Sequence, residues 1–311
     1  MLKLPRLAFT PGLPLAIARI PGMTSNQERK CLYDAARRIE PVGNFVDLGS
    51  WLGSLTASLA AGLLANPNAR LPLPTIFAYD TFVWRDWMTP LAAEDGVTGF
   101  SDGESFLPRF AAETRKWQRV IEVRPGDVAS MSWDDGPISI LVIDAMKDEH
   151  TARAIVSTFF PSLVAGKSLV FQQDFSHFYT SWIHLIWWRL RSYLELTEDV
   201  PRSGGSLYRY VREIPSGEYS TILDFSSADD AEWERAFANS RQLVRPEKMH
   251  QIAAAEVMRL LHAKRGKDAA AMAEKHRDAG RWGREMNLVM QQDEWRLHAA
   301  GHFRPAAGMG A

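Results

Sequence analysis

Short apolar runs, each ending at or just before an acidic residue, recur along the first two thirds of the chain. They are 44–48 with Asp47, 75–79 with Asp80, 119–123 with Asp127, 138–143 with Asp144 and 168–171 with Asp174. Segments with helical spacing separate them, and such alternation predicts a doubly wound, mainly parallel sheet. The run 138–143 is nearly continuous in apolar residues, which is typical of a strand buried on both faces. We therefore expect an α/β fold whose acidic residues gather at the carboxyl ends of the strands, where ligands bind in such sheets.

The pattern changes on either side of this core. A helix is expected over 27–38, with Thr24 or Ser25 as its N-cap. A Trp-rich helix over 180–193 precedes a strand pair at 194–200 and 206–211, which would add an antiparallel edge to the sheet. The expected organisation is an irregular segment 1–23, an α/β domain 24–213, a polar connection 214–245, a helical extension 246–303 and a disordered tail 304–311.

A glycine turn follows the first expected strand. Asp47 lies near the end of that strand. The turn that follows contains Gly49, Ser50 and Gly53 and leads to a helix expected over 54–65. Glycine has no Cβ, so a ligand can approach the backbone and the helix can pack near the strand. The spacing differs from the Gly-x-Gly-x-x-Gly of dinucleotide-binding folds. It resembles the first motif of the class I S-adenosylmethionine-dependent methyltransferases, in which this turn holds the methionine part of the cofactor.

The resemblance extends over about residues 24–212 and implies a seven-stranded, Rossmann-like sheet that binds S-adenosyl-L-methionine. In that family the acid ending the second strand, here Asp80, binds both ribose hydroxyls, because a carboxylate can accept two hydrogen bonds. The acid after the third strand, here Asp127, lies near the adenine amino group, and Val128 offers a backbone amide. The alternative for each acid is a turn former or helix cap.

A second motif concerns the chemistry. The stretch from Asp144 to Lys147 resembles the Asp-x-x-Lys of the cation-dependent O-methyltransferases, including the catechol and caffeoyl-CoA enzymes. The resemblance implies that Asp144 binds Mg²⁺ and that Lys147 helps to deprotonate an acceptor hydroxyl. Asp174 would supply a second oxygen ligand, as Mg²⁺ prefers. The alternatives are a solvated lysine and a helix-capping Asp174.

This chain departs from those families at two positions. The cation-dependent enzymes carry Asp-Asn after the fifth strand, where this chain has Gln172, Gln173 and then Asp174. The macrolide-type sugar O-methyltransferases carry Ile-Asp-Gly-Asp, and Met146 stands in place of their second Asp. The metal site therefore rests on fewer carboxylates than in either family.

Histidines and tryptophans suggest where an acceptor would bind. His177 and His184 lie in the Trp-rich region around 180–193 and could line an acceptor pocket, with one of them as general base. Packing within a helix is their alternative role. Trp84, Trp87 and Phe100 fall in the long aperiodic stretch 81–106, where they would form either a lid or the packing of that stretch on the domain.

Composition limits the function classes. A net charge of −1 gives no electrostatic case for a nucleic-acid partner. One cysteine, Cys31, excludes an internal disulfide framework and suits the cytoplasm. No run approaches the roughly 20 apolar residues of a membrane span, and the N-terminal region lacks the pattern of a signal peptide.

The sequence thus predicts a cytoplasmic S-adenosylmethionine-dependent methyltransferase, acting on an oxygen of a small molecule or saccharide. Two alternatives stay open. One is a nicotinamide-dependent oxidoreductase, which shares the sheet but not the glycine spacing. The other is a non-catalytic cofactor-binding or interaction protein, with the helices over 246–295 as its working surface. Those helices could also form a homo-oligomer contact.

Overall fold

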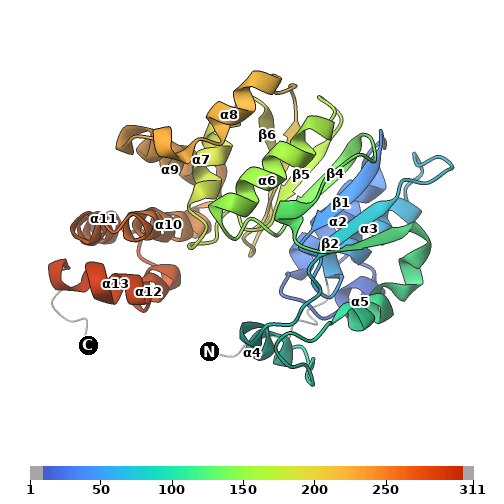
Figure 1. Cartoon of the computed structure of the whole chain (residues 1–311), viewed down its shortest axis with the longest axis horizontal. Helices are drawn as coiled ribbons and strands as arrows, with labels where there is room; N and C mark the ends of the chain where they lie inside the picture. The colour runs from blue at the N-terminus through green and yellow to red at the C-terminus, as the bar shows by residue number, and fades with distance from the viewer. Residues whose placement is uncertain (1–9, 304–311) are drawn as a thin grey trace. The chain divides into compact units, whose positions relative to one another are not determined.

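The computed structural model describes residues 10–303 and divides into two compact units (Figure 1). The first, the α/β unit, comprises Met1–Gln173 and Ser192–Tyr219. The second, the helical unit, comprises Asp174–Arg191 and Ser220–Ala311. The sequence boundaries at 213 and 245 do not mark these units, because the segment 174–191 leaves the sheet after its fifth strand and belongs with the C-terminal helices.

The α/β unit contains a seven-stranded sheet in the order β3-β2-β1-β4-β5-β7-β6. Its strands are β1 (Asn44–Leu48), β2 (Ile76–Asp80), β3 (Ile121–Pro125), β4 (Ile138–Ile143), β5 (Leu169–Gln172), β6 (Leu194–Asp199) and β7 (Ser206–Tyr210). β1 to β5 pair in parallel, whereas β7 pairs antiparallel with β5 and with β6. This is a doubly wound, mainly parallel seven-stranded sheet with an antiparallel edge hairpin, so the predicted fold class is confirmed.

Helices cover both faces of the sheet. On one face, α2 (Asn26–Arg38) and α3 (Ser54–Leu64) share a buried cluster with strand residues such as Phe45 and Ile76. On the other face, Tyr79 contacts Phe159 of α6 (Glu149–Phe159) with ring centroids 5.7 Å apart. Ile76 and Tyr79 point to opposite faces because neighbouring side chains of a strand alternate. β4 is buried along its whole length, as its apolar run predicts.

The start of the described chain is more ordered than its prolines suggest. A short helix, α1 (Leu15–Ala18), buries Ile17, which corrects the expectation of an irregular segment there; residues 1–9 lie outside the described chain. The buried Arg29 guanidinium donates to the carbonyl oxygens of Ile17, Ala18 and Ile20 at 2.8–3.2 Å. α2 then begins with Ser25 as its N-cap, because Ser25 and Glu28 form a capping box.

The long stretch 81–106 contains α4 (Thr89–Ala93) and is followed by α5 (Leu107–Thr114). An isolated bridge pairs Val83 with Ser105, so both ends of this stretch lie together.

Short 3₁₀ turns occur elsewhere along the chain as well as in this stretch. They lie at Asp86–Met88, Arg115–Val120, Val128–Ser130, Phe160–Ser162, Ser216–Glu218, Phe225–Ser227, Pro246–Lys248 and Ala300–His302.

The helical unit combines α7 with the helices that follow the sheet in the chain. It contains α7 (Trp182–Arg189), α9 (Asp230–Leu243), α10 (Met249–His262), α11 (Gly266–Asp278), α12 (Arg284–Met290) and α13 (Asp293–His298), while α8 (Tyr219–Ile222) lies at its border. α9 falls where a polar connection was expected, yet it buries Trp233 and Phe237 and packs on α7. The expected disordered tail, 304–311, lies outside the described residues. No helix within residues 10–303 has both the length and the apolar character needed to cross a membrane.

Candidate functional site

The carboxyl ends of the parallel strands are joined into one continuous edge by backbone hydrogen bonds. Gly49 N–H donates to the Tyr79 carbonyl at 2.8 Å, and Gly126 N–H donates to the Asp80 carbonyl at 2.8 Å. On the other side of β1, Asp144 N–H donates to the Leu48 carbonyl at 2.8 Å. We call this edge the strand-end rim. It brings together the residues after β1, β2, β3 and β4, as the sheet topology predicts.

Both glycines of the turn are required by close packing. Gly49 has φ +91°, and a Cβ there would lie 2.8 Å from the Asp144 carbonyl oxygen. Gly53 has φ +88°, and a Cβ there would lie 2.4 Å from the Thr114 side chain of α5. These are left-handed conformations that glycine adopts without penalty. The glycines therefore let the turn approach β4 and α5, and the space at each Cβ position is filled by the protein itself.

Asp47 is buried beneath this turn. Its Oδ2 accepts a hydrogen bond from Thr56 Oγ1 at 2.5 Å, while its Oδ1 has no hydrogen-bond partner among the described residues. Burial raises the pKa of the Asp47 carboxyl to about 6. The Ser50 hydroxyl donates to the Asp47 carbonyl at 3.1 Å and so closes the turn. Asp47 and Ser50 therefore shape the turn from within.

Asp80 is held at the rim by backbone amides. Its Oδ2 accepts from Trp51 N–H and its Oδ1 from Phe82 N–H, each at 2.9 Å. Burial raises the pKa of Asp80, and these amides oppose the increase. Thr81 Oγ1 also donates to Oδ1, at 3.4 Å, and Oδ2 can accept a further hydrogen bond. Asp80 is thus fixed in orientation and keeps acceptor capacity for a ligand hydroxyl.

Trp51 is a residue that the sequence analysis did not single out. It has a left-handed conformation at φ +47°, which is uncommon for a residue other than glycine. This conformation belongs to the turn in which its N–H donates to Asp80. The sequence did offer a signal for Trp51, because this residue lies between Gly49 and Gly53. The backbone of any residue at that position must follow the path of the turn.

Asp127 is exposed after β3 and accepts a hydrogen bond from Ala129 N–H at 2.9 Å, which caps the short turn Val128–Ser130. The Val128 side chain is buried. This is the capping arrangement that the sequence analysis kept as the alternative for such acids. Asp127 also follows Gly126, whose N–H donates to the Asp80 carbonyl, so it lies on the same rim.

Asp144 and Lys147 meet just after β4. Lys147 Nζ lies 2.9 Å from Asp144 Oδ1, with the lysine side chain 55% exposed and the aspartate 18%. Asp148 caps α6 by accepting from Thr151 N–H at 2.7 Å, which fixes the chain directly after the lysine. The amine is thus anchored at the rim and open to solvent.

Two residues near the predicted magnesium ligands contact each other. Gln172 Nε2 donates to the Met146 sulfur at 3.3 Å, and both side chains are fully buried. Met146 stands where the macrolide-type motif carries its second Asp. Asp174 is buried and belongs to the helical unit. Within residues 10–303, no group of three or more His, Cys, Asp and Glu side chains is placed to hold a metal ion.

Aromatic residues pack the stretch 81–106 against the glycine turn. Trp84 is 1% exposed, and its ring stacks on Phe100 at 4.5 Å and on Trp51 at 5.6 Å. The packing alternative therefore describes Trp84 and Phe100. Trp87 differs, since it is 58% exposed and stacks on Trp51 at 6.4 Å.

The suggestion that His184 acts as a base is wrong. Its ring is buried in the helical unit, where Nδ1 lies 3.0 Å from Ser240 Oγ. Burial, with a smaller contribution from the positive charge of Arg241, lowers the pKa of His184 to about 3. His177 is exposed, and its Nδ1 accepts from Tyr179 N–H at 3.3 Å.

Among comparisons with known proteins, only solved structures match this chain. No protein-family model matches the sequence, and no curated protein matches it significantly. Solved structures similar to it include the O-methyltransferase NovP, at 14% identity and a TM-score of 0.48, covering 62% of this chain and 83% of that chain. The TDP-rhamnose 3′-O-methyltransferase CalS11 matches at 15% identity and a TM-score of 0.41, covering 58% and 76%.

A third similar structure is Haemonchus contortus phosphoethanolamine N-methyltransferase 1 in complex with phosphoethanolamine and S-adenosylhomocysteine. It matches at 11% identity and a TM-score of 0.43, and the match covers 74% of this chain and 52% of that chain. At these identities the likeness concerns the fold.

Proposed function

We propose that this chain is an S-adenosylmethionine-dependent methyltransferase that methylates an oxygen of a small molecule or saccharide. The observation that carries the proposal is the fixed orientation of Asp80 at the strand-end rim, beside the glycine turn. In open α/β sheets this edge is where ligands bind. A carboxylate held by two backbone amides has a fixed orientation and keeps acceptor capacity for a ribose hydroxyl.

Different residues of the strand-end rim have different roles in the proposed binding of the cofactor. Gly49 and Gly53 set the path of the turn, and Trp51 connects that path to Asp80 through its N–H. Asp127 would contact the base portion of the nucleoside, as the resemblance implies. S-adenosylmethionine, when bound, carries the transferred methyl group on a positively charged sulfur. The protein must then hold the acceptor oxygen in line with that methyl group and exclude competing water.

Lys147 is the candidate for activating the acceptor. Its amine is held at the rim by the Asp144 carboxylate at 2.9 Å. A nearby ammonium group lowers the pKa of a hydroxyl, and a hydroxyl that loses its proton more readily is a better nucleophile. Asp144 orients the amine in this scheme. We derive no step through Mg²⁺, because Lys147 engages Asp144 and the neighbouring positions Met146 and Gln172 contact each other.

Calorimetric titration with S-adenosylhomocysteine tests the proposed cofactor site. The wild-type chain should bind, and Asp80→Ala should lose on the order of 1–3 kcal/mol of binding free energy, because hydrogen bonds to the ribose disappear. Asp102→Ala is the matched control, since Asp102 is an exposed carboxylate of the same unit that pairs with Arg85. Thermal unfolding of each variant separates loss of binding from loss of fold.

Three outcomes would contradict the proposal. Wild-type affinity in Asp80→Ala would remove the ribose assignment, and absence of binding by the wild-type chain would remove the cofactor. Binding of a nicotinamide dinucleotide in place of S-adenosylhomocysteine would favour the oxidoreductase alternative. Repeating the titration with and without Mg²⁺ tests the magnesium prediction from the sequence.

The proposal also includes a cellular location and a class of acceptor. A cytoplasmic location is supported by the single, unpaired Cys31. An acceptor without nucleic-acid character is supported by the net charge of −1. If the chain binds the cofactor but transfers methyl to no acceptor, the non-catalytic alternative replaces the enzyme.

A further inference from the structure

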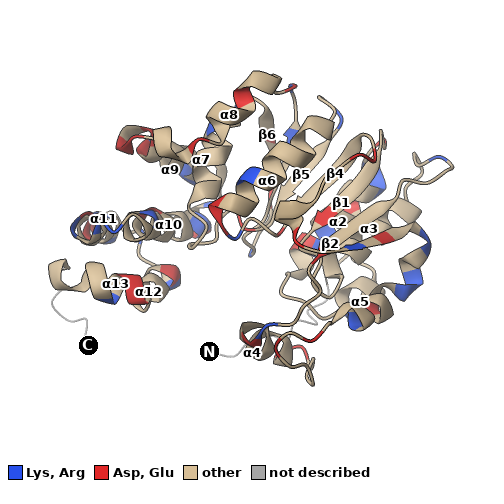
Figure 2. Ribbon diagram, viewed as in Figure 1, with Lys and Arg blue, Asp and Glu red and all other residues tan. Residues whose placement is uncertain are grey.

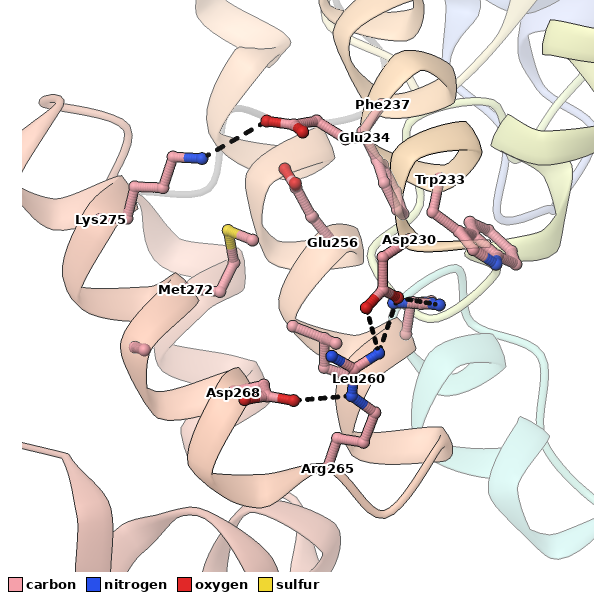
Figure 3. A pocket seen from close by; sticks show the side chains of 12 residues that line it. Asp230, Trp233, Glu234, Phe237, Glu256, Leu260, Arg265, Asp268, Met272 and Lys275 are labelled. Atoms are coloured by element: carbon pink, nitrogen blue, oxygen red, sulfur yellow. Dashed lines mark hydrogen bonds and ion pairs between the residues drawn. The ribbon is translucent and has the colours of Figure 1, made fainter. Parts of the chain in front are cut away.

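The helical unit contains a pocket far along the chain from the rim residues. Its volume is about 360 Å³, within the range of small-molecule sites. Helices α9, α10 and α11, with Arg265 at the N-cap of α11, contribute its lining residues, which are Asp230, Trp233, Glu234, Phe237, Glu256, Arg259, Leu260, Arg265, Asp268, Ala271, Met272 and Lys275. Figure 3 shows these side chains around the space between the three helices.

Ion pairs connect α9 to α11 and to the N-cap residue of α11 on two sides of this pocket. Asp230 of α9 lies 2.7 Å from Arg265, and Glu234 of α9 lies 3.7 Å from Lys275. Figure 3 places one pair on each side of Met272. Arg259 also pairs with Asp230, at 3.0 Å. The three cations of the lining are therefore each compensated by a carboxylate of the lining, which disfavours an anionic ligand.

Glu256 of α10 is the polar group set deepest in the lining. It is 5% exposed, and both of its hydrogen bonds end on Oε2: from Arg241 at 2.6 Å and with His276 Nε2 at 3.0 Å. Oε1 has no hydrogen-bond partner among the residues that the structure describes. Figure 3 shows the carboxylate extending from α10 into the space between Met272 and Phe237.

The protonation of this cluster leaves Glu256 as an acceptor. Arg281 Nε donates to His276 Nδ1 at 2.9 Å, and His276 Nε2 lies 3.0 Å from Glu256 Oε2. Burial acts to raise the pKa of Glu256, but the hydrogen bond from His276 and the charge of Arg241 outweigh it and hold that pKa below its usual value. The carboxylate is thus ionised and has acceptor capacity on Oε1.

The rest of the lining is suited to an apolar body. Trp233 and Phe237 stack with ring centroids 5.9 Å apart on α9, and Leu260 and Met272 face them from α10 and α11. Glu256 Oε1 is not among the fully buried polar atoms of the described residues, so it borders the pocket space and can accept a hydrogen bond from a ligand. A donor with a positive charge would form the strongest hydrogen bond there.

We propose that this pocket binds an organic cation: an amine carried on an apolar or aromatic body, with its ammonium group donating to Glu256 Oε1. The inference is independent of the proposed methyltransferase function, because every lining residue belongs to the helical unit. The body lies against Phe237, Leu260 and Met272. The ion pair of Glu234 and Lys275 also lines the pocket.

Ligand-observed NMR titration of the full chain with 2-phenylethylammonium tests this site. Its matched probes are neutral 2-phenylethanol and anionic 3-phenylpropionate, which share the aromatic body. The ammonium probe should bind saturably and at least about tenfold more tightly than either matched probe, since a charge-assisted hydrogen bond is lost in both. Equal affinity of the neutral or the anionic probe, or no saturable binding of the ammonium probe, would overturn the proposal.

Two variants localise the binding. Glu256→Gln retains the shape of the side chain and should weaken the ammonium probe about tenfold. Met272→Trp fills the pocket without changing its charge and should abolish binding, which keeps the test decisive if Glu256→Gln does not fold. Asp278→Asn is the control, because it removes a 73% exposed carboxylate of α11 outside the lining. Binding that survives Met272→Trp would show that the probe binds elsewhere.

Discussion

A single buried carboxyl group, that of Asp47 beneath the glycine turn, should make the free energy of unfolding depend on pH. Asp47 is fully buried, its pKa is raised to about 6 by burial, and its ordinary value is 3.8. Between these two values the folded chain binds the proton more tightly than the unfolded chain. The free energy of unfolding must therefore fall as pH rises through this interval and then become level with respect to this group.

We expect Asp47→Asn to remove this dependence. A raised pKa of about 6 corresponds to on the order of 2–3 kcal/mol of stability lost from the wild type between about pH 4 and pH 6. The amide cannot ionise, yet its oxygen can still accept from Thr56. Urea unfolding at pH 4.5 and pH 7 measures the difference, with Asp102→Asn as an exposed control. Parallel pH curves for Asp47→Asn and the wild type would contradict the shifted pKa.

Lys147 permits a second prediction at the scale of one residue. Because its side chain is 55% exposed and contacts Asp144, Lys147→Ala should leave affinity for S-adenosylhomocysteine within about twofold. Transfer of radiolabelled methyl groups to a panel of sugar and phenol acceptors should fall about 10²-fold or more. Lys167→Ala, which removes an exposed lysine paired with Glu40, is the control. Undiminished transfer by Lys147→Ala would assign the lysine to the surface alone.

At this scale the sequence located residues better than it assigned their contacts. It placed Asp80 at the end of β2, because an apolar run followed by an acid marks a strand end. It could not show that Trp51 and Phe82 supply amides to that carboxylate, since these contacts depend on the path of two turns. Nor could it show that His184 is buried, because a histidine among tryptophans has the same pattern in a pocket and in a core.

At the scale of elements, the junction between β1 and α3 depends on the glycine that precedes the helix. Gly53 is left-handed at φ +88° and stands where α5 comes closest to the turn, with Thr114 Cγ2 2.4 Å from the position of a Cβ. The backbone conformation and the packing at position 53 therefore both require glycine. Their contributions can be separated, because Gly103 has φ +82° with open space around its Cβ position.

Gly53→Ala should accordingly destabilise the chain more than Gly103→Ala does. The left-handed conformation costs a non-glycine residue about 1–2 kcal/mol at either site. At Gly53, the contact with Thr114 should add on the order of 1–3 kcal/mol, as overpacking does in cores. Denaturant unfolding of both variants measures the difference. Equal losses of stability would show that α5 shifts to accommodate the methyl group.

The elements themselves were predictable where burial is complete. The bounds expected for β1 and β4 agree with the structure, because short apolar runs buried in a parallel sheet leave little ambiguity. The helix expected over 180–193 is shorter, at Trp182–Arg189. The stretch that contains α9 was expected to be a polar connection with some helix. Its charged residues dominate the composition, so the sequence did not show that one side of α9 buries Trp233, Ala236 and Phe237.

For the whole molecule, the chain order of the helical unit matters most. The segment Asp174–Arg191 precedes β6 and β7 of the sheet, yet it packs with helices that follow them. α7 contacts α9, and Arg189 donates to Glu232 at 2.8 and 2.9 Å and to the carbonyls of Thr221 and Asp224. The helical unit is therefore discontinuous in sequence and cannot be removed by a single cut.

A chain shortened to end at Tyr219 should be markedly less stable than one shortened to end at Phe303. The first retains α7 but loses α9, so buried apolar side chains and Arg189 lose their partners. We expect at least about 3 kcal/mol of lost stability and self-association through the exposed face. Size-exclusion chromatography and thermal unfolding measure both effects. A monomeric chain ending at Tyr219 with an unchanged melting temperature would show that α7 needs no such partner.

The interleaved order of the two units also has a consequence for synthesis on the ribosome. α7 emerges before β7, which must still insert beside β5, and its partner α9 is completed only at Leu243. Translation takes roughly 3–10 s to cover the roughly fifty residues between α7 and the end of α9. During that interval an apolar helix is exposed on the nascent chain, which makes it a natural binding site for a chaperone.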